Sequence, residues 1–393
     1  MDGTSNSLGG DADLSDDQRM AIDSLRRVMA RLATPEYLAR IDVEATYPYE
    51  IYDAWTELGL LRIGFPEAYG GIGGDLNDLV LISQELAWWS YDVYTAYSVP
   101  LYTALTLLKT GTEAQKQEFL PALLDGRLRL SSSISEPGAG SDVSALTTSA
   151  RRVDGGWVIN GQKLWNTAAG AKDNTLIVLA RSDSTAAPRK GLSQFLVPND
   201  TPGVECRKLQ MLGRRATGTY EVFFTDVFVP DHHLVGGEAG NGWAGLLACL
   251  QTERVLTSAG YVGSAQKVVD ISLAYAKERQ QFGRPIGEFQ VIAHMLADMQ
   301  TEVDASRLLV QRAAQVMNAG RDALREVSMA KLFGSETYAK VANQGMQVFG
   351  AYGYSMEYEI QRHFRDARST TVGAGSSQMQ RNAIAATMGL KAR

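Results

Sequence analysis

The sequence predicts an α+β protein of several domains, with helices toward both ends of the chain and strands in between. Three observations support this. The 393 residues exceed the usual length of one domain. Apolar residues recur at helical spacing near both ends and alternate at strand spacing in the middle. The turn pairs Asp154-Gly155 and Asn160-Gly161 both fall in the middle segment, where we expect hairpins or turns.

Helices are predicted for residues 15–130. Ser15 and Gln18 have the spacing of a capping box, so the first helix should begin there. One apolar face follows at helical spacing, formed by Met20, Ile22, Leu25, Val28, Met29 and Leu32. The polar, acidic residues 1–14 are expected to be a disordered tail, and they lack the basic start and apolar core of a signal peptide.

Strands are predicted for residues 131–235. The segments 157–162, 175–180 and 219–224 have strand character, and Thr201-Pro202-Gly203 indicates a further turn. This segment has the size of a domain of its own.

Residues 236–393 are predicted to be helical again. Two successive apolar faces are formed by Val255, Ala259, Val262, Val269, Leu273 and Ala276, and by Ile292, Met295, Leu296, Met299 and Val303. Long helices with short connections are typical of a bundle.

Composition excludes several classes of protein. The net charge of −6 and pI of about 5.4 argue against a nucleic-acid partner. Two cysteines cannot form a disulfide framework, which fits a cytoplasmic protein. No apolar run approaches the roughly 20 residues of a membrane span. The histidines lack the spacing of metal ligands, so no metal site is predicted at His232, His233, His294 or His363.

Three glycine-containing or aromatic motifs have more than one interpretation. Gly240-Asn-Gly242-Trp-Ala-Gly245 matches a dinucleotide fingerprint as a string, but it follows a loop, so we interpret it as the entry to a helix. The string SEPGAGSD at 135–142 suits either a phosphate cradle or a surface loop. Trp165 and Thr167 share one face of a strand, either as a platform for a planar cofactor or as ordinary sheet packing.

Five strings together resemble an acyl-CoA dehydrogenase. They are SEPGAGSD, NGQKLWNT, ERQQFGRPIGEFQ, QVFGAYGY and RDAR…GSSQMQR, in this order, and the similarity runs from about residue 15 to about residue 390. The resemblance implies an N-terminal α-helical domain at 15–130, a middle β domain of barrel or sandwich type at 131–235, and a C-terminal four-helix-bundle domain at 236–393.

The resemblance also implies that FAD is the cofactor. Ser135 and Thr167 would contact the isoalloxazine ring, Trp165 would cover one side of it, and Ser141 would face phosphate. The remaining contacts, partly with the FAD of a partner subunit, fall on Arg279, Phe282, Gln290, Gln347, Gly350 to Gly353, Ser376 and Gln378. Such shared contacts imply a homo-oligomer, either a dimer or a tetramer.

The reaction implied is α,β-dehydrogenation of an acyl thioester, in which a carboxylate removes the α proton and the β hydrogen leaves as hydride. The family's usual glutamate position is Ala374 here, in the loop Gly373-Ala374-Gly375. Its backbone N–H could still donate to the thioester oxygen. In isovaleryl-CoA and long-chain members of the family the base comes from the first helix of the bundle, where Glu253 stands in this chain. We therefore predict Glu253 as the base, with a pKa that rises when substrate and flavin exclude water.

Two neighbours of Glu253 complete the predicted site. Arg254 is expected to support either the loop at Ala374 or the flavin site. Gln251 replaces an acid that many members of the family use toward the adenosine end of CoA. The acyl group is expected on CoA, and the missing acid makes an acyl group on a carrier protein the second candidate. An electron-transfer flavoprotein is the expected electron acceptor. A flavin monooxygenase or oxidase on the same fold would also fit the resemblance, as would a catalytically inactive binding protein.

Overall fold

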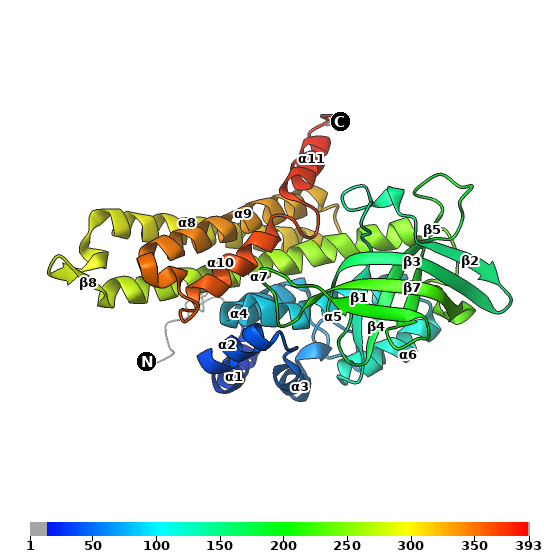
Figure 1. Ribbon diagram of the computed structural model, residues 1–393, viewed down its shortest axis with the longest axis horizontal. Helices are drawn as coiled ribbons and strands as arrows, with labels where there is room; N and C mark the ends of the chain where they lie inside the picture. The colour runs from blue at the N-terminus through cyan, green and yellow to red at the C-terminus, as the bar shows by residue number, and fades with distance from the viewer. Residues whose placement is uncertain (1–13, 392–393) are drawn as a thin grey trace. The chain divides into compact units, whose positions relative to one another are not determined.

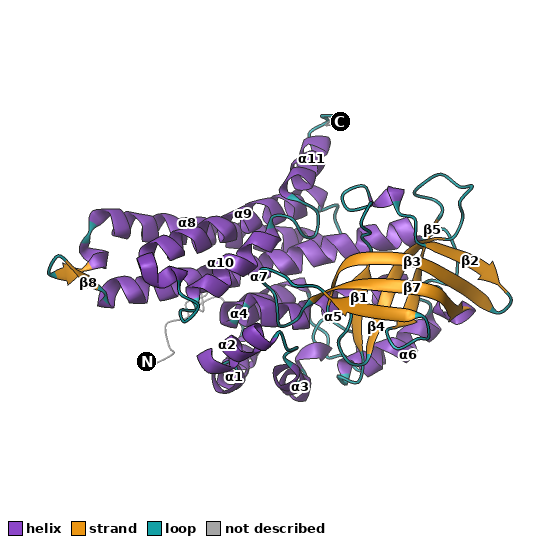
Figure 2. Ribbon diagram, viewed as in Figure 1, coloured by secondary structure: helices purple, strands orange, loops and turns teal. Residues whose placement is uncertain are grey.

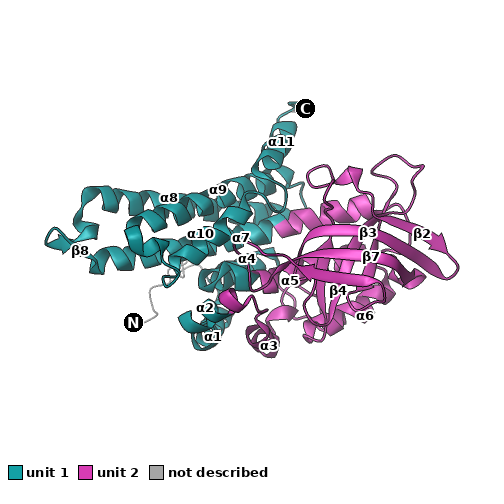
Figure 3. Cartoon of the chain, viewed as in Figure 1, with its two compact units in different colours: residues 1–40, 75–94, 254–393 teal, residues 41–74, 95–253 magenta. Residues whose placement is uncertain are grey.

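The computed structural model describes residues 14–391, which form two compact units (Figure 3). Unit 1 contains the described parts of Met1–Arg40, Asp75–Tyr94 and Arg254–Arg393, and unit 2 contains Ile41–Gly74 and Thr95–Glu253. Three helices contribute residues to both units, namely α2 (Pro35–Glu44), α5 (Tyr91–Thr110) and α7 (Gly242–Glu278). Residues 1–13 of the predicted tail lie outside the described residues, and Leu14 is the one tail residue that the structure describes. The predicted domain limits after residues 130 and 235 stay predictions.

Unit 1 is helical apart from one short hairpin (Figure 1). Helix α9 packs against α8, α10 and α11, while α4 packs against α8 and α1. A methyl group at Gly345 of α9 would lie 2.7 Å from both Val268 of α7 and Ile360 of α10, so these three helices pack closely. The elements are α1 (Asp16–Leu32), α4 (Leu76–Trp89), β8 (Gln280–Gln281), β9 (Arg284–Pro285), α8 (Gln290–Asn318), α9 (Leu324–Phe349), α10 (Ile360–Thr370) and α11 (Ser377–Thr387).

The start of α1 confirms the predicted capping box. Ser15 accepts from the Gln18 backbone N–H at 3.2 Å, and the Gln18 side chain accepts from the Ser15 N–H at 3.1 Å. The predicted apolar face was wrong at Met20, which is 63% exposed, because the buried stripe is centred on Ile22, Leu25 and Met29. Reciprocal capping satisfies N–H groups that the first helical turn leaves without partners.

Unit 2 is built around a seven-stranded sheet with helices beside it (Figure 2). The strand order is β1-β4-β2-β3-β7-β6, and β5 also pairs with β4. The elements are α3 (Tyr49–Glu57), α6 (Glu113–Leu124), β1 (Arg129–Ser133), β2 (Ser149–Val153), β3 (Gly156–Thr167), β4 (Asn174–Arg181), β5 (Leu192–Pro198), β6 (Val204–Lys208) and β7 (Thr219–Pro230).

The predicted strands are confirmed as parts of β3, β4 and β7, and one predicted turn is wrong. Asp154-Gly155 connects β2 to β3, and Thr201-Pro202-Gly203 connects β5 to β6, as expected. Asn160-Gly161 instead lies inside β3, where the pairing with β7 shifts register. Gly161 has φ +149°, and a Cβ there would lie 2.6 Å from the Thr148 Oγ1. The glycine therefore marks a bulge and a close approach between strands rather than a chain reversal.

The first turns of α7 belong to the core of unit 2. Leu246 and Leu250 pack with Leu179 of β4, Leu192 of β5 and Ala139 of the loop after β1. The helix begins at Gly242 after a loop, which confirms the interpretation of the Gly240–Gly242 string. This apolar cluster fixes the start of α7 against the segment that carries SEPGAGSD. Within residues 14–391, no helix has both the length and the apolar character needed to cross a bilayer.

Candidate active site

A buried ion pair fixes the loop after β1 to β3. The Lys163 Nζ lies 2.9 Å from the Glu136 Oε1 and also donates to the Ile134 carbonyl at 2.9 Å. Glu136 further accepts from the backbone N–H groups of Thr147 and Thr148, at 2.7 and 2.8 Å. Burial alone would raise the pKa of Glu136, but the Lys163 charge and these hydrogen bonds outweigh it and lower the pKa to about 2. The ion pair between Glu136 and Lys163 thus attaches the loop to the sheet.

Next to this ion pair, β3 presents an exposed aromatic side chain. The Leu164 N–H donates to the Ser135 carbonyl at 2.8 Å, so the loop and strand meet there. The β3–β7 register shifts between Lys163 and Asn166, and Trp165 takes φ +66° with 57% of its surface exposed. Buried Asn166 then accepts from the Ser133 hydroxyl at 2.8 Å. A β-bulge of this kind re-aims a side chain.

Thr167 and Ser141 complete the predicted residues of unit 2. The Thr167 Oγ1 accepts from Arg214 at 3.0 Å. Ser141 is exposed and follows a tight turn in which Glu136 and Ala139 exchange backbone hydrogen bonds of 3.0 and 3.1 Å. Ser135, Trp165 and Thr167 are therefore brought to one part of the sheet, and Ser141 lies on the loop attached to it.

Glu253 is half-buried at the end of the α7 segment that belongs to unit 2. Burial and, second, the Glu253 charge raise the pKa of the Cys249 thiol to about 12, so this carboxylate lies close to Cys249. The Cys249 Sγ is 3.8 Å from the Ser132 Oγ, and the Thr252 Oγ1 accepts from the Lys109 Nζ at 3.2 Å. These contacts hold this part of α7 against β1 and α5. Gln251 is also half-buried here.

In unit 1, three side chains donate hydrogen bonds to the backbone carbonyls of the loop that contains Ala374. The Arg254 Nε donates to the Ala374 carbonyl at 3.0 Å. The Gly375 carbonyl accepts from the Lys331 Nζ at 2.7 Å and from the Gln380 amide at 2.9 Å. Ala374 takes φ +53°, and its own N–H finds no acceptor among the described residues. The loop therefore offers a free backbone donor on a fixed support.

The tip of the β8–β9 hairpin carries the predicted residue Phe282. Phe282 and Gly283 have φ +51° and +78°, and the Phe282 ring is 93% exposed. Arg279, just before the hairpin, lies over the Tyr352 ring at 5.2 Å. Gly350 takes φ +61° with open space around it, whereas a Cβ at buried Gly353 would lie 2.8 Å from the Met346 carbonyl. Tight packing thus explains Gly353, while Gly350 provides an unusual backbone turn.

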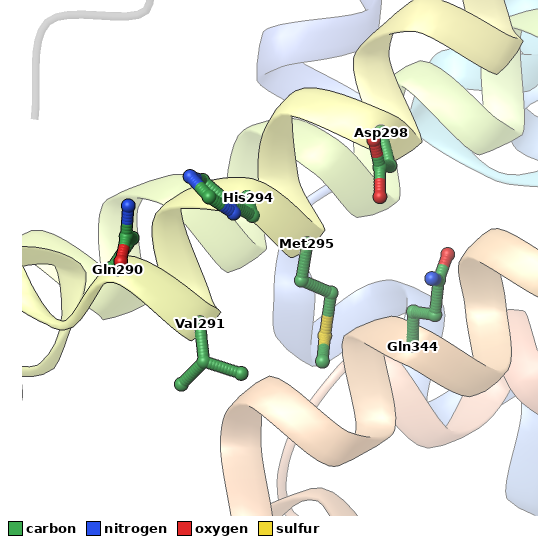
Figure 4. Close-up of a pocket in the computed structure, with 6 residues that line it drawn as sticks. All are labelled: Gln290, Val291, His294, Met295, Asp298 and Gln344. Carbon is green, nitrogen blue, oxygen red and sulfur yellow. The ribbon is translucent and has the colours of Figure 1, made fainter.

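A pocket of about 450 Å³ lies between α8 and α9 (Figure 4). It includes the predicted residue Gln290, and its whole lining is Gln290, Val291, His294, Met295, Asp298 and Gln344. Gln347 follows Gln344 on α9 and is exposed. Ser376 caps α11 by accepting from the Met379 N–H at 3.4 Å, and Gln378 is exposed in the first turn of that helix.

The sequence analysis predicted Arg254 as a support of the Ala374 loop, which its hydrogen bond to the Ala374 carbonyl matches, but it missed the other supporting residues of both regions. Glu136 and Lys163 each sit inside one of the five strings, so opposite charges in two motifs were an available signal. Lys331 is fully buried at a position that continues an apolar helical face, which was a second signal. Gln380 gave no signal, because only the folded loop brings its amide to the Gly375 carbonyl.

The chain matches three domain models of one family. Residues 15–127 match the acyl-CoA dehydrogenase N-terminal domain, residues 131–227 the middle domain, and residues 240–389 the C-terminal domain. Benzylmalonyl-CoA dehydrogenase of Aromatoleum aromaticum is 37% identical over 95% of this chain and 98% of its own length. Mitochondrial isovaleryl-CoA dehydrogenase of Oryza sativa subsp. japonica is 35% identical over 94% and 90%.

Among solved structures, butyryl-CoA dehydrogenase from Megasphaera elsdenii superposes with a TM-score of 0.91 at 31% identity, covering 96% of this chain and 99% of that one. The fold is accordingly an N-terminal helical domain, a middle β half-barrel and a C-terminal helical domain. The chain therefore belongs to the acyl-CoA dehydrogenase family and is an FAD-dependent oxidoreductase that acts on CH–CH groups.

Proposed function

We propose that Glu253 is the base of an acyl-CoA α,β-dehydrogenation. One observation carries the proposal: residue 374 has no carboxyl group, while α7 supplies half-buried Glu253 directly before Arg254, the residue that holds the Ala374 carbonyl. A single helix thus supplies a carboxylate and supports the loop from which the usual carboxylate is missing. Position rather than helix identity decides whether a carboxylate can act as a base.

The residues of the sheet fit an isoalloxazine ring. Trp165 is held in a left-handed bulge with its ring largely exposed, beside the hydroxyl of Thr167 and the loop at Ser135. An aromatic face and nearby hydroxyls suit a planar polar ring. We propose that Ser141 contacts an FAD phosphate. The remaining proposed FAD contacts, some of them with the FAD of a partner subunit, are Arg279, Phe282, Gln290, Gln347, Gly350, Gly353, Ser376 and Gln378.

Groups of this chain would remove the α proton and stabilise the thioester oxygen. When bound, FAD would supply the acceptor for the hydride that leaves the β carbon. The Glu253 carboxylate would take the α proton, and the Ala374 N–H would donate to the thioester oxygen as negative charge develops there. Because Arg254, Lys331 and Gln380 hold the loop's carbonyls, this donor would be oriented before the substrate binds.

The substrate is proposed to be a branched, medium-chain or long-chain acyl-CoA. The name isovaleryl-CoA dehydrogenase among the relatives supports a branched acyl group. Gln251 lacks the charge that many members of the family use toward the adenosine end of CoA. Acyl-carrier thioesters should therefore be tested beside CoA thioesters. An electron-transfer flavoprotein is the proposed acceptor, and a dimer or tetramer the proposed assembly.

Anaerobic bleaching of the bound flavin tests the base. Glu253→Gln should retain FAD, measured by its absorbance, and should reduce it about 10²–10⁴ times more slowly across a panel of acyl-CoA and acyl-carrier thioesters. Glu238→Gln, in the exposed loop before α7, is the matched control and should bleach like the wild type. Normal bleaching by Glu253→Gln would refute the assignment, and rapid reoxidation of reduced wild type in air would favour an oxidase or monooxygenase.

A further inference from the structure

The structure brings two histidines and a glutamate together where the sequence predicted no metal site. Glu118 lies on α6, and His232 and His233 lie on the 3₁₀ helix η5 (Asp231–His233) that follows β7. One ligand atom from each of the three side chains lies within 4.8 Å of the other two. The sequence analysis missed the cluster because 113 residues separate Glu118 from His232 in the chain. We propose that Glu118, His232 and His233 bind a divalent transition-metal ion such as Zn²⁺.

A buried glutamine holds the two halves of this site together. Gln115, one turn before Glu118 on α6, is only 2% exposed. Its amide donates to the carbonyls of His232 and Leu234, at 2.8 and 2.7 Å, and its oxygen accepts from the Gly236 N–H at 3.2 Å. The backbone that carries the imidazoles is thus fixed to the helix that carries the carboxylate, and a fixed backbone reduces the ordering needed when an ion binds.

The His233 ring is held in place by its neighbours. It packs edge-on against Phe119 with ring centroids 5.6 Å apart. A hydrogen bond to the Leu196 backbone also orients the ring. Metals bind the unprotonated imidazole, and a backbone hydrogen bond orients such a ring.

The choice of metal follows from the ligand types. Imidazole and carboxylate together suit Zn²⁺ and its neighbours better than Mg²⁺ or Ca²⁺, which prefer oxygen ligands. The Glu118 and His232 side chains are exposed, so they are free to rotate toward an ion at zinc bond lengths of about 2.0–2.2 Å. Asp231 is not counted as a ligand because Arg152 already holds both of its carboxylate oxygens. Three protein ligands leave a fourth position for water.

A bound ion would tie α6 to the connection between β7 and α7. This is the segment already held by Gln115, and it leads directly into the loop before Gly242. The expected effect is a more stable unit 2, because an ion that binds only the folded state stabilises it.

Zinc titration of the FAD-loaded protein by calorimetry, with Co²⁺ absorbance as a second readout, tests the site. The wild type should bind one Zn²⁺ per chain and gain thermal stability that a chelator reverses. Loss of an outer partner of a metal ligand typically weakens binding about 10–100-fold, so Glu118→Gln, His232→Ala and His233→Ala should each weaken it at least tenfold. Glu113→Gln, an exposed glutamate of the same helix, should bind like the wild type.

Circular dichroism and FAD content establish that each variant is folded before binding is compared. No zinc binding by the wild type would overturn the proposal. So would equal binding by all variants, because the ion would then occupy a different site.

Discussion

Lys163 and Glu136 are both buried, and their pairing ties the Ser135 loop to the strand of Trp165. Breaking a buried pair leaves one uncompensated charge inside the protein. The exposed pair of Arg207 and Glu205, at 2.7 Å, has water available to both partners and is expected to matter much less.

We expect this pair to shape the acid stability of the protein. The pKa of Glu136 falls from 4.5 to about 2 on folding, so its contribution is complete above pH 4.5 and is lost as the pH falls toward 2. Lys163→Met should lower the free energy of unfolding at neutral pH by about 3–5 kcal/mol and flatten this acid loss. Urea unfolding at a series of pH values measures both effects.

Two further variants control this prediction. Adding Glu136→Gln to Lys163→Met should recover part of the loss, because no charge is then left buried. Arg207→Met should leave the free energy of unfolding nearly unchanged, because both partners of this pair are exposed to water. Equal losses for Lys163→Met and Arg207→Met would contradict a buried pair.

Ala374 has a backbone conformation that favours glycine. At φ +53° an L residue carries about 1–2 kcal/mol of strain, while glycine adds about 0.5–1 kcal/mol of entropy to the unfolded chain. Ala374→Gly should therefore raise the free energy of unfolding by up to about 1 kcal/mol. Ala21→Gly, an exposed site within α1, should instead lower it by about 1 kcal/mol. Opposite signs in urea unfolding at saturating FAD are the expected result, and a loss in both variants would contradict it.

At the scale of elements, β3 and α7 position the two regions of the site. Strand β3 contains two register shifts against β7, one at Gly161 and one at Trp165, and the second exposes the aromatic ring. Helix α7 extends over 37 residues and carries Glu253 and Arg254 in succession. The first bulge depends on a close approach to Thr148 that only glycine permits, since a Cβ at Gly161 would lie 2.6 Å from the Thr148 Oγ1.

Gly161→Ala tests the first bulge. An added methyl group would lie 2.6 Å from the Thr148 Oγ1 and 2.7 Å from its Cα, which should cost about 1–3 kcal/mol of unfolding free energy beyond the backbone strain. Gly155→Ala, at φ +73° with open space, should cost only the strain of about 1–2 kcal/mol. Chemical denaturation of the two variants side by side measures the difference, and equal costs would show that β2 and β3 separate easily at this point.

At the scale of the whole molecule, the compact units do not follow chain order. Unit 1 joins α1 and α4 to the C-terminal helices, so segments far apart in sequence share one core. Unit 1 also exposes large apolar side chains, among them Phe282 at 93%, Tyr354 at 90% and Val291 at 68%. Phe282 lies at the tip of the β8–β9 hairpin, and we propose that its exposed ring contacts a partner chain in the homo-oligomer.

Phe282→Asp tests that contact. Sedimentation of the wild type should give a mass well above the 42.7 kDa of one chain, and the variant should shift toward one chain and lose FAD, because a charge replaces an apolar contact. Met20→Asp, at a 63% exposed position of α1, should leave both mass and FAD content unchanged. A wild type that sediments as a single chain with FAD bound would refute the proposed assembly.

The sequence by itself determined the order of helices and strands, the start of α1 and the family. These follow from local patterns: capping at Ser15 depends on residues three positions apart, and strand alternation depends on a period of two. Five strings in a fixed order carried the resemblance, and the domain models that match the chain confirm it.

Tertiary structure alone decided the features that depend on distant residues. Asn160-Gly161 has the local signal of a turn, yet β7 and Thr148 make it a bulge. The Glu136–Lys163 pair, the loop contacts of Lys331 and Gln380, and the cluster of Glu118 with His232 and His233 join residues from different elements. Such contacts depend on long-range packing, which spacing along the chain does not encode.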